Sequence, residues 1–164
     1  MIYDKIMLAV SNQKGGVFFL HGYGGTGKAF MWRTLASAFR SKHEIVLTVA
    51  ISGIASLLLP GGRTAHSKFK MPVPTFDNST CNIDHDSDMT ELLRQTKLII
   101  WDEAPMAHRY TIECLDRTLK GIMSEGENKC DAIFGGKVIV FGRILGRFYL
   151  LYPEGTNQTL CMLQ

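Results

Sequence analysis

Gly22-Tyr23-Gly24-Gly25-Thr26-Gly27-Lys28-Ala29 follows directly on the apolar run Val17-Phe18-Phe19-Leu20, and this junction is the most informative part of the chain. The β-branched and aromatic run predicts a buried strand. Apolar residues spaced along 30–40 predict an amphipathic helix behind the glycines. A strand, a glycine-rich loop and a helix in this order are typical of a phosphate-binding loop, whose backbone N–H groups surround phosphate oxygens.

The loop matches the pattern G-x-x-x-x-G-K-[ST] at every position except the last. Lys28 is expected to reach the β- and γ-phosphates as a point charge, and the start of the following helix attracts the same anion. Ala29 occupies the last position and lacks the hydroxyl that would bind Mg²⁺. The alternative is a glycine-rich turn that binds nothing, which leaves a lysine directly after the last glycine unexplained. The predicted nucleotide-binding residues are Gly22, Gly24, Gly25, Thr26, Gly27, Lys28 and Ala29.

Length and composition indicate one globular α/β domain. The chain has 164 residues, of which 46% are hydrophobic and 20% charged, and its net charge of +3 permits nucleic-acid binding without requiring it. It contains no apolar run of the roughly 18 residues that span a membrane, and residues 1–10 resemble neither a signal peptide nor a transit peptide. The four cysteines are not spaced as C-x-x-C, so we expect no zinc site. Because no secretory signal is visible, we expect reduced thiols in an intracellular protein.

Apolar runs alternate with helical patterns along the chain. The predicted strands are 17–20, 45–50, 98–101 and 138–141. The predicted helices are 3–10, 30–40, 54–59, 88–95 and 110–123, and prolines make 71–86 a loop. Alternation of this kind predicts right-handed βαβ units, which build a mainly parallel sheet with helices on both faces. Ligands of such sheets bind beyond the carboxyl ends of the strands.

A second candidate site element follows the strand predicted at 98–101. Asp102 at the strand tip is expected to hold Mg²⁺, and Glu103 to orient and deprotonate an attacking water. Successive residues leave a strand in different directions, so one carboxylate can face the metal and the other the γ-phosphate. The alternative is an exposed, polar strand end without a catalytic role.

Four motifs occur in one order, and together they are more specific than the phosphate-binding loop alone. They are Gly22–Lys28, Thr48–Ala55, Gly61–Ser67 and Trp101–Met106. This combination resembles the petite-integration-frequency DNA helicases, in the form found in plant genomes and related to helitron transposon helicases. The resemblance runs from about Tyr3 to Gly142. It implies a three-layer RecA-like P-loop NTPase domain, with a partial RecA-like domain at 1–142 and a divergent tail at 143–164.

The resemblance also implies an activity and partners. Members of this family are ATP-dependent helicases that unwind DNA 5′ to 3′ and serve in DNA repair, recombination and telomere maintenance. The implied cofactors are ATP and Mg²⁺, and the implied partner is single-stranded DNA. The nucleus or the mitochondrion is the implied location, with no membrane association and with an oligomeric state that the sequence leaves open.

The resemblance assigns roles to individual residues. Lys28 and Glu103 would be catalytic, and Asp102 would hold the metal. Hydroxyls, a backbone turn and the nearby Arg63 and Lys68 suit phosphate contacts on a DNA track. The residues implied for this track are Ser52, Gly53, Thr64, His66 and Ser67.

Neighbours of that track have simpler interpretations as well. Phe69 could offer a stacking face to a base, or it could belong to the core. His66 could be a packed structural histidine. Lys68 and Lys70 could form an ordinary solvated face.

The sequence departs from the family at four places. Ala29 removes a metal ligand; the stretch before Tyr3 with its adenine-reading Gln is missing; and a second RecA-like domain with an arginine finger is missing. After Gly142, the family's Asp position holds Ile144 and the position of its phosphate-sensing Gln holds Arg147. Matching sequence resumes at 153–156 in the same register, which suggests two compensating frame changes; sequencing the transcript tests this hypothesis.

These departures predict a truncated domain that is impaired in catalysis and does not unwind DNA by itself. Two alternatives stay open. One is a module that binds nucleotide or single-stranded DNA without turnover, and the other is a P-loop NTPase that is not a helicase.

Overall fold

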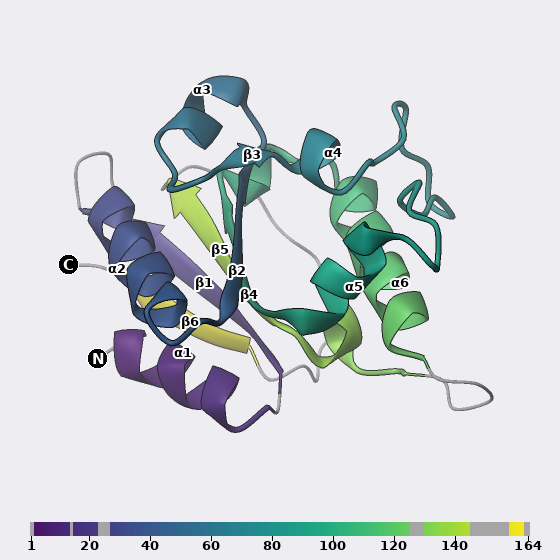
Figure 1. Cartoon of the computed structure of the whole chain (residues 1–164). Helices are drawn as coiled ribbons and strands as arrows, with labels where there is room; N and C mark the ends of the chain where they lie inside the picture. Colours follow the sequence, from purple (N-terminus) through teal and green to yellow (C-terminus); the bar gives the residue numbers. More distant parts are fainter. Residues whose placement is uncertain (1, 14, 23–26, 125–129, 145–157, 163–164) are drawn as a thin grey trace.

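A six-stranded parallel sheet forms the centre of the protein (Figure 1). The computed structural model describes residues 2–13, 15–22, 27–124, 130–144 and 158–162. Within these residues the strand order is β3-β2-β4-β5-β1-β6, and each neighbouring pair is parallel. The strands are β1 (Gly16–Gly22), β2 (Ile45–Ala50), β3 (Arg63–Thr64), β4 (Thr96–Asp102), β5 (Val138–Ile144) and β6 (Gln158–Met162).

Helices cover both faces of this sheet, which makes three layers (Figure 1). On one face lie α1 (Ile2–Ser11) and α2 (Lys28–Arg40); on the other lie α5 (Asp88–Gln95) and α6 (Arg109–Met123). Two short helices, α3 (Gly53–Leu57) and α4 (Ala65–Lys68), lie above the carboxyl edge of the sheet with β3. Two 3-10 turns, η1 (Ala104–Met106) and η2 (Ile133–Gly136), precede α6 and β5.

Alternating strand residues pack into two separate cores, one on each face of the sheet. Phe19 of β1 packs in the core that α5 and α6 close, whereas Phe18 and Leu20 pack in the core under α1 and α2. The side chains of β4 alternate in the same way: Trp101 packs in the core under α5 and α6, and Ile100 packs in the core under α1 and α2. Because successive side chains leave a strand on opposite faces, strands that are buried on both sides must be apolar almost throughout.

The α/β prediction is confirmed, and so is each of the four predicted strands. The five predicted helices are also present, with ends that differ by at most two residues. Sequence reasoning missed β3, α4 and β6. Two residues are too few to show a period, and four residues make barely one helical turn, so β3 and α4 depend on tertiary contacts with β2.

The predicted boundary after Gly142 stays a prediction. β5 continues through Ile144, and β6 pairs with β1 at the edge of the same sheet. In the described part of the chain Cys81, Cys114 and Cys130 are free thiols, as predicted for these three. No helix in that part is long and apolar enough to cross a membrane.

Candidate active site

The carboxyl ends of β1, β2 and β4 gather most of the predicted site residues at one edge of the sheet. Gly22 ends β1, Asp102 ends β4, and Ser52 stands two residues beyond β2. β5 lies between β4 and β1, with Gly142 opposite Leu20 in the pairing register. Any group that reaches from β4 to the loop after β1 must therefore pass over β5.

The lysine at the start of α2 contacts the end of β1. Lys28 Nζ donates a hydrogen bond of 2.8 Å to the carbonyl oxygen of Gly22, six residues earlier. Gly27 precedes α2 with φ 83° and ψ 15°, a left-handed conformation that glycine adopts without a steric penalty. Ala29 is exposed in the first turn of α2. The predicted ligands Gly24, Gly25 and Thr26 lie outside the described residues.

Asp102 extends over β5 through a gap that a glycine leaves open. A Cβ atom built on Gly142 would overlap Asp102 Oδ1 and would lie 2.9 Å from Cζ2 of Trp32. Trp32, from α2, is fully buried, and its indole nitrogen has no hydrogen-bond partner at ordinary distance among the described residues. Gly142 therefore gives Asp102 and Trp32 their space beside the phosphate-binding loop.

Burial sets the electrostatics of Asp102. It raises the pKa of the carboxyl above its usual range, and the neighbouring charge of Glu103 adds to this. The backbone N–H of Glu103, the Trp32 indole and the charge of Lys28 lower the pKa and offset part of the rise. Burial leaves the negative charge of Asp102 poorly solvated, and a bound divalent cation would compensate this charge. Asp102 is therefore a suitable ligand for such a cation.

We expect Asp102→Asn to raise the free energy of unfolding at neutral pH. A carboxyl whose pKa is raised by folding makes the protein less stable as the pH climbs from the unfolded-state pKa through the folded-state pKa, and the loss persists above it. The variant should lack this decline. Urea unfolding between pH 4 and pH 8 measures it, with the exposed Asp131→Asn as control. Parallel pH profiles for Asp102→Asn and the unmodified chain would contradict the expectation.

Glu103 has a strained main chain and a hydrogen-bonded side chain. Its φ of 55° and ψ of 27° lie in the left-handed region, which is uncommon for a residue with a Cβ. Its N–H donates to Asp102 Oδ1 at 3.0 Å, and its carbonyl accepts from Met106 N at 2.9 Å. Its Oε2 accepts a 2.8 Å hydrogen bond from the hydroxyl of Ser52. Strain of this kind persists where surrounding contacts fix it, and it is frequent at active sites.

The residues predicted for DNA contact lie on α3 and α4, toward the β3 edge of the sheet. Ser52 precedes α3 and accepts a hydrogen bond from Ala55 N at 3.1 Å, while Thr64 precedes α4 and accepts from Ser67 N at 3.3 Å. Both hydroxyls therefore cap helices, a local role that the sequence pattern S/T at a helix start predicts. The other candidates are Gly53 and Ser67, which are exposed, and His66, which is half-buried.

The stacking role considered for Phe69 is wrong. The ring is fully buried, and its centroid lies 6.3 Å from that of Trp101 in the core. Its neighbours remain available to an anion: Arg63 and Lys70 are exposed, and the pKa of Lys68 is lowered by burial and by the charge of Arg63. This segment therefore offers positive charge but no aromatic platform at Phe69.

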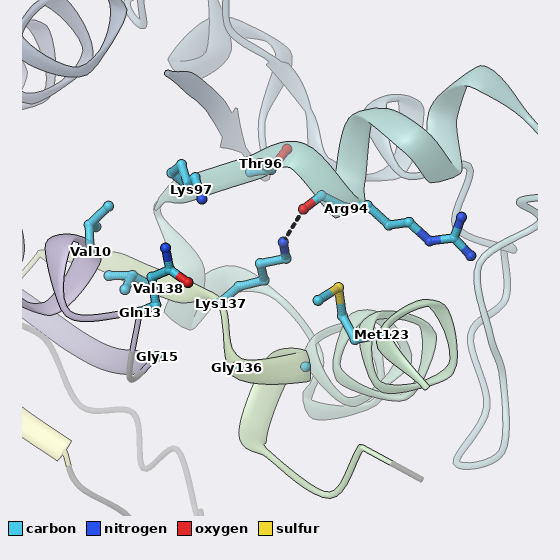
Figure 2. A pocket seen from close by; sticks show the side chains of 11 residues that line it. Val10, Gln13, Gly15, Arg94, Thr96, Lys97, Met123, Gly136, Lys137 and Val138 are labelled. Carbon is cyan, nitrogen blue, oxygen red and sulfur yellow. Dashed lines mark hydrogen bonds between the residues drawn. The ribbon is translucent and has the colours of Figure 1, made fainter. Parts of the chain in front are cut away.

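A pocket of about 260 Å³ lies at the opposite, amino edge of the sheet and is separate from these residues (Figure 2). Lys137 points across it and donates a hydrogen bond to the carbonyl oxygen of Arg94, near the end of α5. A cation at a helix C-terminus satisfies a carbonyl that the helix leaves free. Lys137, directly before β5, thus links the end of α5 to the start of β5, and this structural role accounts for its burial.

The donor set fits a metal ion only together with a bound nucleotide. No group of three or more His, Cys, Asp or Glu side chains in the described residues could hold a metal. Mg²⁺ commonly uses one or two carboxylates together with nucleotide phosphates. Asp102 beside Lys28 meets this requirement, and Ala29 adds no ligand.

Sequence reasoning missed Gly142 and Trp32 as parts of this site. A glycine near the end of a buried strand was the available signal, since glycine within a strand often marks the close approach of another group. Trp32 gave no signal, because a tryptophan on the buried face of a helix is ordinary core.

Comparisons with known proteins agree with this architecture. The sequence pattern of the PIF1-like helicase family matches residues 1–159. The ATP-dependent DNA helicase PIF4 of Trypanosoma brucei brucei is 33% identical over 114 residues, covering 65% of this chain and 13% of that protein. The ATP-dependent DNA helicase Pif1 of Campylobacter jejuni is 27% identical over 161 residues, covering 93% of this chain and 32% of that protein.

A solved structure gives the same picture. The crystal structure of Bacteroides Pif1 bound to single-stranded DNA matches with a TM-score of 0.63 at 28% identity, covering 87% of this chain and 32% of that one. The three-layer fold is therefore RecA-like. The chain spans about a third or less of the length of each of these relatives.

Proposed function

Because the chain belongs to the PIF1-like helicase family, we propose that it forms the ATP-binding and single-strand-contacting part of an ATP-dependent DNA helicase that moves 5′ to 3′. One observation carries this proposal. A single edge of the sheet holds Lys28 at the base of the loop, Asp102 beside it, and Glu103 hydrogen-bonded to Ser52. The names of the relatives include ATP dependence and single-stranded DNA, and this edge offers chemistry for both.

In the proposed mechanism the loop backbone and three side chains have separate roles. The loop backbone from Gly22 to Ala29 binds the phosphates, and Lys28 moves from the Gly22 carbonyl to the β- and γ-phosphates. Asp102 would hold Mg²⁺, which neutralises charge on the transferring phosphoryl group when it is bound. Glu103 accepts a proton from the attacking water.

We also propose single-stranded DNA as the partner and DNA maintenance as the cellular role. Single-stranded DNA contacts Ser52, Gly53, Thr64, His66 and Ser67. The helicase activity serves DNA repair, recombination and telomere maintenance, in the nucleus or the mitochondrion. We divide the chain into a partial RecA-like domain at 1–142 and a divergent segment at 143–164. The plant and helitron-like affiliation belongs to the same proposal.

We further propose that hydrolysis by this chain is weak. Ala29 provides no hydroxyl for the metal, and metal neutralisation accounts for much of the catalysis of phosphoryl transfer. The same substitution favours a second candidate function, a module that holds nucleotide or single-stranded DNA without turnover. A P-loop NTPase of another kind is less consistent with the family match, and phosphotransfer independent of DNA would revive it.

The first test is nucleotide binding. Titration with a fluorescent ATP analogue should saturate, and Lys28→Ala should weaken binding by roughly 10-fold or more, because a charge-assisted hydrogen bond to phosphate is lost. Lys42→Ala, an exposed lysine just beyond α2, is the matched control and should bind normally. Equal affinity for Lys28→Ala and Lys42→Ala, with both folded by circular dichroism, would contradict the proposal.

A further inference from the structure

One hydrogen bond joins the two halves of the site. The hydroxyl of Ser52 donates to Glu103 Oε2 at 2.8 Å across 51 residues of sequence. We propose that Ser52 is a positioning residue that couples the contact with single-stranded DNA to the freedom of Glu103. This inference rests on the proposed function, because it takes Ser52 as a DNA contact and Glu103 as the base.

The Ser52 hydroxyl has a single proton to donate. Ser52 Oγ accepts from Ala55 N, and its one hydrogen is directed to Glu103 Oε2. A phosphate oxygen that approaches Ser52 can receive a hydrogen bond from this hydroxyl only if the bond to Glu103 is broken. DNA phosphate and Glu103 therefore compete for one donor.

The bond from Ser52 also restrains the side chain of Glu103. The main chain of Glu103 is fixed, since its N–H donates to Asp102 Oδ1 and its carbonyl accepts from Met106 N. Only the side chain can turn. While Ser52 donates to it, Oε2 is held toward α3, so the carboxylate cannot turn freely toward a water at the γ-phosphate.

These bonds form a continuous path from the metal-binding carboxylate to the DNA-contacting hydroxyl. Asp102 accepts from the Glu103 backbone, and Glu103 accepts from Ser52. Breaking the second bond frees the base without moving the strand that holds Asp102. Coupling is reciprocal in binding free energy, so weakening the Ser52–Glu103 bond must favour DNA just as DNA weakens that bond.

Reciprocity gives a test that needs no ATP turnover. Affinity for a fluorescent single-stranded oligonucleotide is measured in a double-mutant cycle of Ser52→Ala and Glu103→Ala. With Ser52 present, Glu103→Ala removes a negative charge and releases the hydroxyl proton; with alanine at 52 it removes only the charge. We expect Glu103→Ala to tighten binding more with Ser52 present, by an extra factor on the order of 10.

Three further variants separate coupling from structural effects. Ser52→Thr keeps the hydroxyl and should preserve the coupling. Ser52→Gly removes the hydroxyl at a helix cap that tolerates glycine, and it replaces Ser52→Ala if that variant unfolds. Ser87→Ala removes the equivalent cap of α5, whose hydroxyl accepts from Thr90 N, and should leave oligonucleotide binding unchanged.

The outcomes distinguish this inference from the proposed function. If Glu103→Ala changes the affinity by the same factor in both backgrounds, the coupling is overturned while DNA binding stands. If the folded, unmodified chain binds no oligonucleotide, the DNA-contacting part of the proposed function fails, and the coupling fails with it. An extra factor that Ser52→Thr retains and Ser52→Gly lacks supports the coupling.

Discussion

Gly142→Ala is expected to lower the free energy of unfolding by about 1–3 kcal/mol, the usual range for overpacking a filled interior. The added methyl group would overlap Asp102 Oδ1 and crowd the ring of Trp32 at 2.9 Å. Trp32 is fully buried, so its ring cannot move aside without disturbing the core under α2. The carboxylate of Asp102 must then move, and nucleotide binding in the presence of Mg²⁺ should weaken as well.

The matched control for this substitution is Gly121→Ala. Gly121 is exposed within α6, and a Cβ atom there would meet nothing within 4 Å. Alanine is favoured over glycine in a helix by roughly 0.5–1 kcal/mol, so this variant should be more stable than the unmodified chain. Urea unfolding followed by circular dichroism measures both variants. If Gly142→Ala is as stable as Gly121→Ala, Gly142 is not required for the space beside Asp102.

The sheet could be predicted because its strands are buried on both faces. A strand such as 98–101, with no polar residue among four, has few other interpretations when Asp102 and Glu103 follow it. The phosphate-binding loop stays a prediction, and the sequence indicates it for a different reason. Its glycines and Lys28 are close together in sequence, so the site element and its signal are local.

Features that depend on distant contacts could not be predicted. The Ser52–Glu103 bond joins residues that are 51 positions apart, and no local pattern around Ser52 relates it to Glu103. The role of Gly142 depends on which strand lies between β4 and β1, and local sequence patterns do not predict strand order. The burial of Phe69 confirms one of the two alternatives that the sequence left open, and the packing of its ring against Trp101 decides between them.

We expect Ala29→Ser to increase Mg²⁺-dependent ATP hydrolysis. Ala29 lies in the first turn of α2, one residue after Lys28, where the pattern of phosphate-binding loops places a hydroxyl on the metal. Restoring this ligand should raise turnover on the order of 10- to 100-fold, since even outer-shell partners of a metal contribute effects of that size. Phosphate release measured with and without Mg²⁺, and with and without single-stranded DNA, tests this.

Glu103→Gln in the Ala29→Ser background makes the test specific. Glutamine keeps the shape of the side chain but cannot accept the proton of the attacking water, so turnover should fall by roughly 10²-fold or more and the gain should be lost. Glu113→Gln, which alters the ion pairs of Glu113 with Arg109 and Arg117 on α6 instead, should leave the gain intact. If Ala29→Ser binds nucleotide but turnover does not rise, the missing hydroxyl is not what limits this chain. The binding module without turnover then becomes the better description of its function.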